Sequence, residues 1–128
     1  MKKVIIITGA SSGIGKSIGN YLTEKGHIVY GTSRNPEKYP KSEFTLVKSD
    51  INKKSDTLDL VNYVTTSEGK IDVLINNAGI GYTGPIEESR IEDIESLFST
   101  NFFGPIEMIK NTLPVMRKNN SGLIINIT

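Results

Sequence analysis

Five short apolar segments recur along the chain, and each is five or six residues long. They cover residues 4–8, 28–32, 44–48, 71–76 and 123–127, and most are rich in Val or Ile. Several are continuously apolar instead of alternating, which is typical of strands buried on both faces of a parallel sheet. Between them lie segments with helical spacing, such as Ile14, Ile18 and Leu22. The alternation of strand and helix predicts an α/β fold with right-handed crossovers.

The last helical segment is the longest and carries the widest apolar face. Ser89 and Glu92 stand at capping-box spacing, which predicts that the helix starts there. Its apolar positions form one stripe, widened by Phe103 and Ile106: Ile94, Leu97, Phe98, Phe102, Met108, Ile109, Leu113 and Met116. An apolar arc this wide predicts packing against more than one layer. Basic residues in the last turn suit the helix dipole before the segment NNSG ends the helix.

Length and charge restrict the class of partner. At 128 residues the chain is long enough for one domain with a sizeable core. The net charge of +1 gives no electrostatic reason to expect nucleic acid or an anionic membrane as partner. No cysteine is present, which excludes thiolate metal ligands, and we predict no metal site. The apolar run at residues 4–7 is too short for a secretion signal or a membrane span, so we expect a cytoplasmic protein.

The segment TGASSGIG, residues 8–15, lies between the first predicted strand and the first predicted helix. Gly9, Gly13 and Gly15 allow the backbone to turn tightly and to approach a ligand closely. The free amides at the start of the helix favour a phosphate group. The G-x-x-x-G-x-G spacing therefore predicts a pyrophosphate site, and an ordinary glycine-rich turn is the alternative.

Ser33 and Arg34 end the second predicted strand. In dinucleotide-binding units an acidic residue at this place holds the adenosine ribose hydroxyls, whereas an Arg pairs with a 2′-phosphate. A charge-assisted contact contributes about 1.5–3 kcal/mol, which corresponds to about a ten- to hundredfold preference for the phosphorylated cofactor. The alternative is a solvated surface arginine beside a turn.

The segment INNAG, residues 75–79, ends the fourth predicted strand. It places a polar group and then two nearly side-chain-free residues at the carboxyl end of a central strand, where open α/β sheets bind ligands. A plain turn explains Asn and Gly together. It does not explain why the exits of the first and the fourth strand are both small and polar.

Five features resemble the short-chain dehydrogenase/reductase family in order and spacing over the whole chain: TGASSGIG, then Asp50, NNAG, Asn101 and the closing GLIINIT. The resemblance implies a three-layer doubly wound Rossmann fold with five parallel strands in the order 3-2-1-4-5. It also implies a cofactor site. The pyrophosphate and ribose contacts come from Gly9, Ser11, Ser12, Gly13, Ile14 and Gly15, the adenine contacts from Asp50 and Ile51, and the cleft lining from Asn77, Ala78 and Gly79. For Asp50 a capping or turn role is the alternative.

Asn101 is the candidate catalytic residue. It falls beside the apolar stripe, where a buried amide without partners costs about 1–3 kcal/mol. Pro105 has no N–H to donate to the Asn101 carbonyl four residues earlier, so that carbonyl is left free. The resemblance implies that this carbonyl holds a water of the proton relay. The alternative is a proline kink with a satisfied Asn, and Pro114 removes a second helical bond with no role attached.

The family's catalytic Ser and Tyr-x-x-x-Lys pair are expected beyond the closing strand. Tyr21 and Lys25 have the required spacing, but we expect Tyr21 on the apolar face of the first helix and therefore accidental. We accordingly expect residues 1–128 to be a single NAD(P)-binding Rossmann domain that is C-terminally incomplete, truncated after the fifth strand.

The resulting hypothesis is the NADP(H)-binding portion of an oxidoreductase that moves hydride between nicotinamide and a carbonyl or alcohol. NADP(H) is expected in preference to NAD(H), with Ser33 and Arg34 making the choice. The complete enzyme is expected to act on a small-molecule substrate and to form a homo-oligomer, and this chain alone is expected to bind without turnover. A non-catalytic NADP-binding sensor or interaction protein and an inactive truncated product are the alternatives.

Overall fold

The computed structural model describes all 128 residues, and its centre is one parallel sheet. Its five strands stand in the order β3-β2-β1-β4-β5. They cover Val4–Ile7 (β1), Ile28–Ser33 (β2), Thr45–Lys48 (β3), Val73–Asn76 (β4) and Leu123–Asn126 (β5). The predicted strands and their order are confirmed. β3 and β4 start slightly later than predicted, although the apolar residues just before them, Phe44 and Ile71, are still buried.

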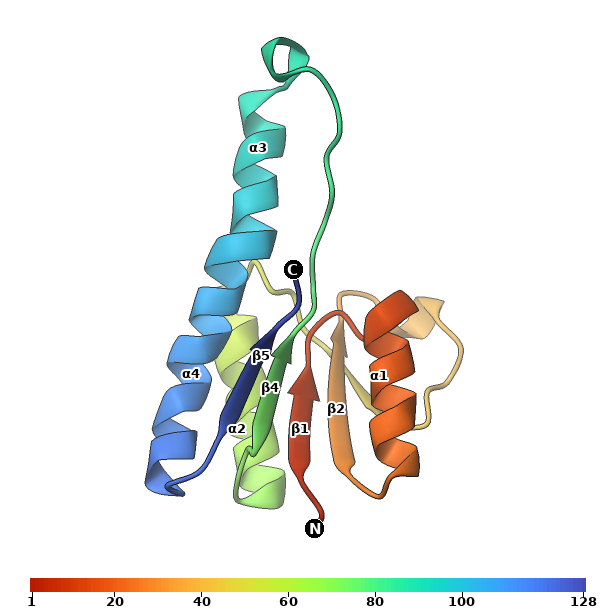
Figure 1. Cartoon of the computed structure of the whole chain (residues 1–128), viewed down its shortest axis with the longest axis vertical. Helices are drawn as coiled ribbons and strands as arrows, with labels where there is room; N and C mark the ends of the chain where they lie inside the picture. Colours follow the sequence, from red (N-terminus) through yellow and green to blue (C-terminus); the bar gives the residue numbers. More distant parts are fainter.

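Helices cover the two faces of the sheet unequally (Figure 1). α1 (Gly13–Glu24) lies on one face, while α2 (Lys54–Glu68) and α4 (Gly104–Lys118) lie on the other. Short 3-10 turns, η1 (Pro36–Lys38) and η2 (Ile86–Glu88), interrupt the connections. This arrangement confirms the three-layer doubly wound Rossmann fold.

β1 is buried on both faces, as its continuous apolar run predicts. Val4 and Ile6 pack into the cluster formed with α2 and α4, which includes Leu60, Val64 and Met108. Ile5 and Ile7 point to the other face, where Phe44 and the inner side of α1 cover them. Each such side chain contributes about 1.5–3 kcal/mol when removed from water, so the central strand anchors both layers.

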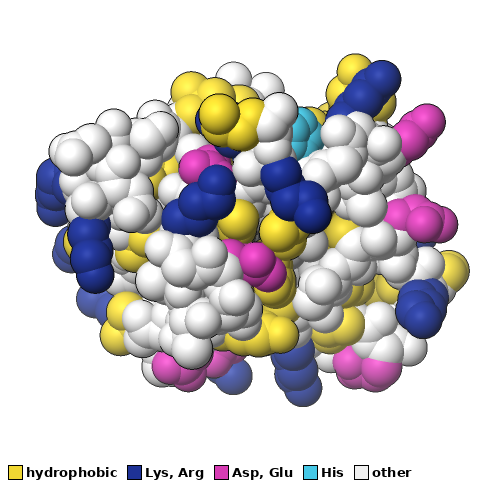
Figure 2. Space-filling view, turned by 90° about the horizontal axis from the view of Figure 1, so that it is seen from below, with side chains coloured by type: hydrophobic (Ala, Val, Ile, Leu, Met, Phe, Trp, Pro, Cys, Tyr) yellow, Lys and Arg dark blue, Asp and Glu magenta, His cyan; other side chains and the backbone are white.

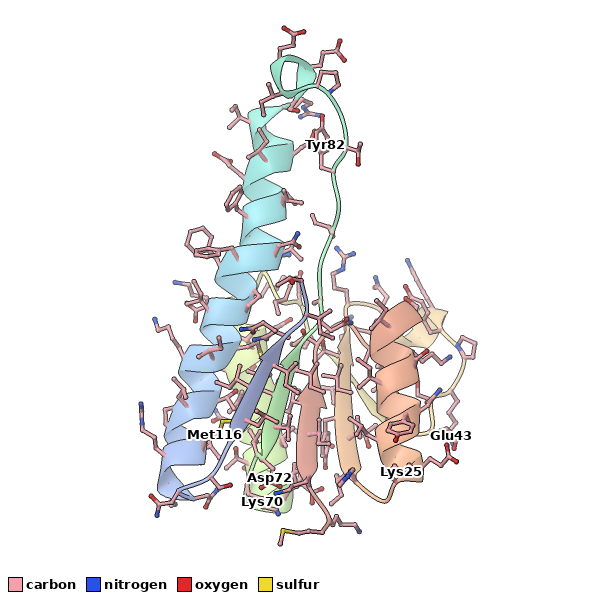
Figure 3. All side chains as sticks on the ribbon, viewed as in Figure 1. Lys25, Glu43, Lys70, Asp72, Tyr82 and Met116 are labelled. Carbon is pink, nitrogen blue, oxygen red and sulfur yellow. The ribbon has the colours of Figure 1, made fainter.

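The amino end of β4 is tied to β1 by a carboxylate (Figure 3). The Val4 amide donates to Asp72 Oδ2 over 2.8 Å, and Lys70 Nζ lies 3.0 Å from the same oxygen. Burial of the carboxyl raises its pKa, but the Val4 hydrogen bond and Lys70 outweigh burial and hold the pKa of Asp72 below its ordinary value. The charged form of Asp72 is therefore favoured by folding.

Tyr30 is a buried side chain with a polar hydroxyl, and it lies on the same face of the sheet as α2. Its hydroxyl donates to Glu68 Oε1 over 2.6 Å, and its ring meets Tyr63 edge to face at 5.8 Å between centroids. Burial, and then the hydrogen bond to Glu68, raise the pKa of Tyr30 to about 12. The hydroxyl therefore stays protonated and fastens β2 to the last turn of α2.

Acidic and basic side chains are interspersed over the end of the molecule opposite the carboxyl ends of the strands (Figure 2). This mixture agrees with the net charge of +1. In addition, none of the helices is both long enough and apolar enough to cross a membrane.

The start of the long helix differs from the prediction. α3 (Ile91–Phe98) begins two residues after Ser89, and its first turn has no side-chain cap. The hydroxyl of Ser89 instead donates to the Pro85 carbonyl, because Ser89 closes the preceding 3-10 turn in an extended conformation. Glu92 lies 3.7 Å from exposed Arg90 and does not reach back to Ser89. The capping-box prediction was therefore wrong.

The long helix is continuous but contains a wide turn. Between α3 and α4, Ser99–Phe103 form a π-helical segment in which the Gly104 amide donates to the Ser99 carbonyl. Met108 and Met116 of α4 are buried against the sheet, whereas α3 has no buried residue. The prediction that the whole stripe packs against more than one layer therefore holds only for α4. In Figure 1, α3 extends beyond the carboxyl end of the sheet.

Candidate functional site

A pocket of about 390 Å³ opens at the carboxyl ends of the strands. It lies at the point between β1 and β4 where the strand order reverses. Open α/β sheets bind their ligands at such a point. Its lining comes from the strand exits and the wide turn: Gly9, Ser11, Ser12, Ile14, Thr32, Ser33, Arg34, Asn35, Tyr39, Ser49, Ile51, Asn52, Asn77, Ala78, Gly79, Ile80 and Thr100. Most of the predicted cofactor residues therefore meet in one pocket.

The glycine loop has no room for side chains where it crosses the exit of β4. A Cβ at Gly9 would stand 2.8 Å from Ala78 Cα, and Gly9 has a positive φ of 65°. A Cβ at Gly15 would stand 2.3 Å from the Gly9 carbonyl oxygen. Contact between the two loops thus explains why residues at both strand exits are small.

Gly13 differs from the other two loop glycines. Its φ is 57°, and nothing lies within 4 Å of the place where a Cβ would stand. A glycine is therefore required at position 13 because the backbone there is left-handed, and not because space is short. Gly13 and Gly15 shape the loop without lining the pocket itself.

Hydrogen bonds fix the glycine loop to its neighbours. Thr8 Oγ1 accepts from the amides of Asn77 and Ala78, each over 3.0 Å. Asn77 Nδ2 donates to the carbonyls of Thr8 and Gly9, and the Gly9 amide donates to Thr32 Oγ1. Three strand exits are thereby joined into one rigid floor.

The N-terminus of α1 has the features of an anion-binding site. Ser12 is the N-cap residue in an extended conformation, but its side chain makes no cap hydrogen bond. The first-turn amides, which an N-cap Ser commonly satisfies, are left without that partner. The first turn also contains no acidic residue. A phosphate group fits this combination of free amides and the positive end of a helix dipole.

Ser33 ends β2, and Arg34 follows it at the edge of this pocket. Ser33 is buried, and its Oγ accepts from the Asn35 amide over 3.2 Å, which fixes the turn after the strand. Arg34 is exposed and is the only charged residue that lines the pocket. No carboxylate lines the pocket, so a phosphate beside Arg34 meets no repulsive partner there.

Asp50 and Ile51 occupy different positions after β3. Ile51 lines the pocket, whereas Asp50 does not. The Asp50 carboxylate accepts from the Asn52 amide over 2.9 Å, and its own amide donates to Asp56 Oδ2 over 3.0 Å. The side chain therefore closes a local turn, which is the alternative role that the sequence left open.

Asn101 lies in the wide turn, outside the pocket, and it is exposed instead of buried as the sequence suggested. Its side-chain amide is nevertheless paired on both atoms. Oδ1 accepts from the Ile80 amide over 2.8 Å, and Nδ2 donates to the Ile80 carbonyl over 2.7 Å. Asn101 thus holds the loop that follows β4. A role for its main-chain carbonyl in catalysis stays a prediction.

Asn101 also lines an adjoining cavity of about 550 Å³ between α4 and the ends of β4 and β5. Asn76 and Asn126 meet at its base, where Asn76 Nδ2 donates to Asn126 Oδ1 over 2.9 Å. Asn77, Ala78 and Gly79 line both this cavity and the first pocket. The two spaces therefore share the exit of β4.

Sequence reasoning missed several residues that line the pocket. They are Thr32, Asn35, Tyr39, Ser49, Asn52, Ile80 and Thr100. The signal that could have found Thr32 and Ser49 is their position, because each is a polar residue at the carboxyl end of a strand. The others reach the pocket from turns and from the long helix, and no local pattern indicates that approach.

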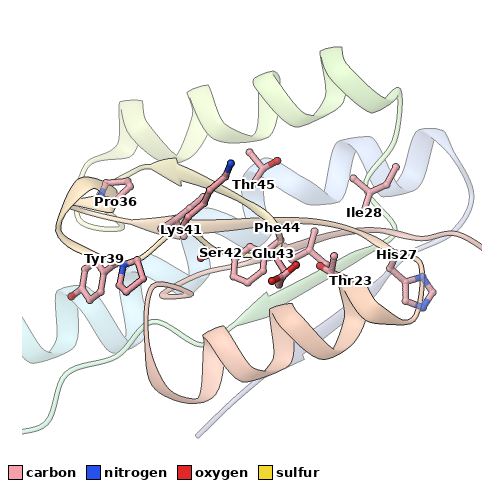
Figure 4. A pocket seen from close by; sticks show the side chains of 13 residues that line it. Thr23, His27, Ile28, Pro36, Tyr39, Lys41, Ser42, Glu43, Phe44 and Thr45 are labelled. Carbon is pink, nitrogen blue, oxygen red and sulfur yellow. The ribbon is translucent and has the colours of Figure 1, made fainter.

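A separate cavity of about 590 Å³ lies between the end of α1 and the loop before β3 (Figure 4). Lys41, Glu43 and His27 are the titratable side chains at its wall besides Tyr39. Figure 4 shows Lys41 and His27 pointing in different directions. They do not converge on one point, so the cavity lacks the arrangement of a built ligand site.

Tyr21 and Lys25 do not form a catalytic pair. Tyr21 is 59% exposed, so its expected position on the apolar face of α1 was wrong. Lys25 Nζ lies 5.4 Å from the centre of the Tyr21 ring, a cation–π contact on the outer face of α1. Neither residue lines the pocket. No group of three or more His, Asp or Glu side chains is placed to hold a metal ion.

The doubly wound sheet, the glycine loop and the free helix N-terminus together define a Rossmann-type fold. A sequence profile of the short chain dehydrogenase family matches residues 3–128. The chain therefore belongs to the short-chain dehydrogenase family.

Individual relatives agree with this assignment. A 3-ketodihydrosphingosine reductase from Bacteroides thetaiotaomicron is 45% identical over 127 residues, which cover 98% of this chain and 46% of the relative. The structure of a short-chain dehydrogenase from Streptomyces avermitilis matches with a TM-score of 0.91 at 33% identity, covering 99% of this chain and 49% of that one. A metagenomic short-chain oxidoreductase in complex with NADP matches with a TM-score of 0.90 at 29% identity, covering 98% and 62%. The chain spans about half the length of the first two relatives.

Proposed function

We propose that residues 1–128 form the NADP(H)-binding part of an oxidoreductase that transfers hydride between nicotinamide and a carbonyl or alcohol. The observation that carries the proposal is the charge of the pocket. Arg34 is its only charged lining residue, and no acidic side chain replaces it at the exit of β2. The NADP found in the metagenomic relative supports the same cofactor.

The residues of the pocket fit the parts of such a cofactor. The amides after Ser12 would hold the pyrophosphate, and Ser33 with Arg34 would hold the 2′-phosphate. Ile51 would pack against the adenine, and Asn77 to Gly79 would form the floor below the sugar. When bound, the nicotinamide supplies or accepts the hydride, and the chain itself binds, orients and excludes water around it.

The chain's own residues support binding better than chemistry. Asn101 does not titrate near neutral pH, so it cannot act as a general acid or base. Its proposed role is to hold a water through its main-chain carbonyl. A positioned acid or base contributes about a hundred- to ten-thousandfold to the rate. We therefore propose that residues 1–128 alone bind NADPH without turning over a substrate.

Calorimetric titration of the chain with NADPH and with NADH tests the cofactor choice. We expect tighter binding of NADPH, and Arg34→Ala should reduce that preference about tenfold or more because the 2′-phosphate loses a charge-assisted contact. Arg90→Ala, at an exposed Arg just before α3 and outside the pocket, serves as the matched control. Equal affinity of the unmodified chain for both cofactors would contradict the proposal.

Absorbance of NADPH in the presence of simple ketones and aldehydes tests for turnover. The first substrate to add is 3-ketodihydrosphingosine, because the relative named for its reduction is 45% identical. No consumption above the protein-free rate is expected from residues 1–128. Sustained consumption that Gly13→Asp abolishes would show that the chain has a catalytic group of its own.

A further inference from the structure

The loop after β3 is bonded to the wide turn of the long helix by one side chain. Asn52 Oδ1 accepts from Ser99 Oγ over 2.6 Å and lies 3.3 Å from Thr100 Oγ1, while Asn52 Nδ2 donates to Thr100 Oγ1 over 3.1 Å. These partners are separated by 47 and 48 positions in the sequence. Thr100 is buried, Ser99 is half-buried and Asn52 is exposed, so the cluster runs from the surface into the packed part of the turn.

Packing joins the same two segments beside these hydrogen bonds. A Cβ at Gly104 would stand 2.4 Å from Ile51 Cγ1, so the Ile51 side chain rests directly on the helix backbone just after the wide turn. Ile51 and Asn52 also line the pocket. Ile51 and Asn52 therefore face the pocket and also contact the long helix at or just after the wide turn.

The wide turn is also hydrogen-bonded to the loop after β4. Asn101 lies in its centre and pairs with both backbone groups of Ile80, at 2.8 and 2.7 Å. Ile80 is exposed and lies in a segment without regular structure. The two hydrogen bonds to Asn101 therefore hold its backbone in place. Ile80 lines the same pocket from the opposite strand exit.

We propose that the hydrogen-bond cluster of Asn52, Ser99 and Thr100 is a positioning device that couples the two ends of the cofactor pocket. The adenine end, at Ile51 and Asn52, fixes the wide turn, and the wide turn fixes Ile80 through Asn101. Ser99 is the informative member because it does not line the pocket and acts only through Asn52. The inference rests on the proposed function, because it takes an adenine nucleotide as the occupant.

Hydrogen exchange with a half cofactor tests the coupling. Adenosine 2′,5′-bisphosphate carries the adenine and the 2′-phosphate but no nicotinamide. Its binding should slow exchange of the Ile80 amide about tenfold in the unmodified chain, because that amide donates to Asn101 Oδ1. In Ser99→Ala the slowing at Ile80 should fall to about twofold or less, while slowing at the β2 exit, around Arg34, should persist.

Three further variants separate coupling from general loosening. Ser96→Ala, on the same helix, is exposed and should behave like the unmodified chain. Ser99→Thr keeps the hydroxyl that donates to Asn52 Oδ1 and should retain most of the slowing at Ile80. Thr100→Val keeps the shape of the side chain but removes the acceptor of Asn52 Nδ2, so it should lose the slowing as Ser99→Ala does.

The outcomes separate this inference from the proposed function. If adenosine 2′,5′-bisphosphate fails to bind the unmodified chain, the proposed function fails. If it binds and Ile80 is slowed equally in Ser99→Ala, Thr100→Val and the unmodified chain, the coupling is wrong and the cofactor assignment stands. Loss of slowing in both Ser99→Ala and Thr100→Val, with retention in Ser96→Ala and Ser99→Thr, supports the coupling.

Discussion

The two halves of the long helix both carry an apolar stripe but lie in opposite environments. α4 places Met108, Thr112 and Met116 in the core, where they meet β1, β4 and α2. α3 and the wide turn carry equally apolar side chains, yet Phe98, Phe102 and Phe103 are more than half exposed. The Phe102 ring meets the rings of Phe98 and Phe103 edge to face, and no second layer covers them.

The difference shows that an amphipathic pattern predicts which face of a helix is apolar but not what covers it. α4 runs alongside the sheet, whereas α3 has passed the carboxyl ends of the strands and has no layer to meet. Exposed aromatic patches of this kind are typical of surfaces that bind another protein chain. The comparison therefore predicts large effects of mutation in α4 and small effects on folding in α3.

The largest expected effect is truncation of a core side chain in α4. Met108 is fully buried, so Met108→Ala should reduce the free energy of unfolding by about 2–5 kcal/mol through lost burial and the cavity that remains. Phe102→Ala, at 53% exposure, should cost about 1 kcal/mol or less despite the larger side chain. Urea unfolding of both variants checks the contrast, and equal losses would show that the wide turn is packed as tightly as α4.

A smaller effect on the free energy of unfolding is expected from two ion pairs, one at the packed amino end of β4 and one at the exposed start of α3. Asp72 bonds to the Val4 amide and to Lys70 at the packed end of the sheet, whereas Glu92 faces Arg90 on the surface of α3. Near neutral pH, Asp72→Asn should lower the free energy of unfolding by about 1–3 kcal/mol. Glu92→Gln should change it by about 0–1 kcal/mol, as is usual for exposed pairs.

The pH dependence of the Asp72 contribution follows from its lowered pKa. Because folding favours the charged carboxylate, the contribution is complete above the ordinary pKa of 3.8 and is lost as pH falls through the lower value of the folded state. The difference between the unmodified chain and Asp72→Asn should therefore shrink in acid. Unfolding midpoints measured at several pH values check this, and a difference that is constant down to strongly acidic pH would contradict it.

A further comparison of the two halves of the long helix concerns association, which is not an effect on folding. We predict that the chain forms dimers or larger assemblies through the exposed rings of the long helix or the open edge of β5, because both are unpartnered. Phe102→Asp should weaken association by about tenfold if the helix is the contact, since a charge would be buried there. Sedimentation velocity over a range of concentrations measures it, and a monodisperse unmodified monomer at high concentration would overturn the prediction.

Much of the site was predictable because its signals are local. Gly13 in the glycine loop needs a left-handed backbone. Ala78 is small because the exits of β1 and β4 approach each other closely. Arg34 follows a strand directly, so its place at the pocket edge was expected from strand polarity alone. Asp50 shows the limit of such reasoning, because the same residue suits a ligand contact and a local turn, and the hydrogen bonds place it in the turn.

The five strands, the helices between them, the α/β class and the loop that suits a pyrophosphate could all be predicted from the sequence, because hydrophobic period and glycine spacing act over neighbouring residues. The contacts of Asn52 with Ser99, of Asn101 with Ile80 and of Ile51 with Gly104 became visible only in the folded chain. These contacts join segments that are 21 to 53 positions apart in the printed sequence. They depend on where each layer lies against the sheet, and a pattern of neighbouring residues carries no information about that placement.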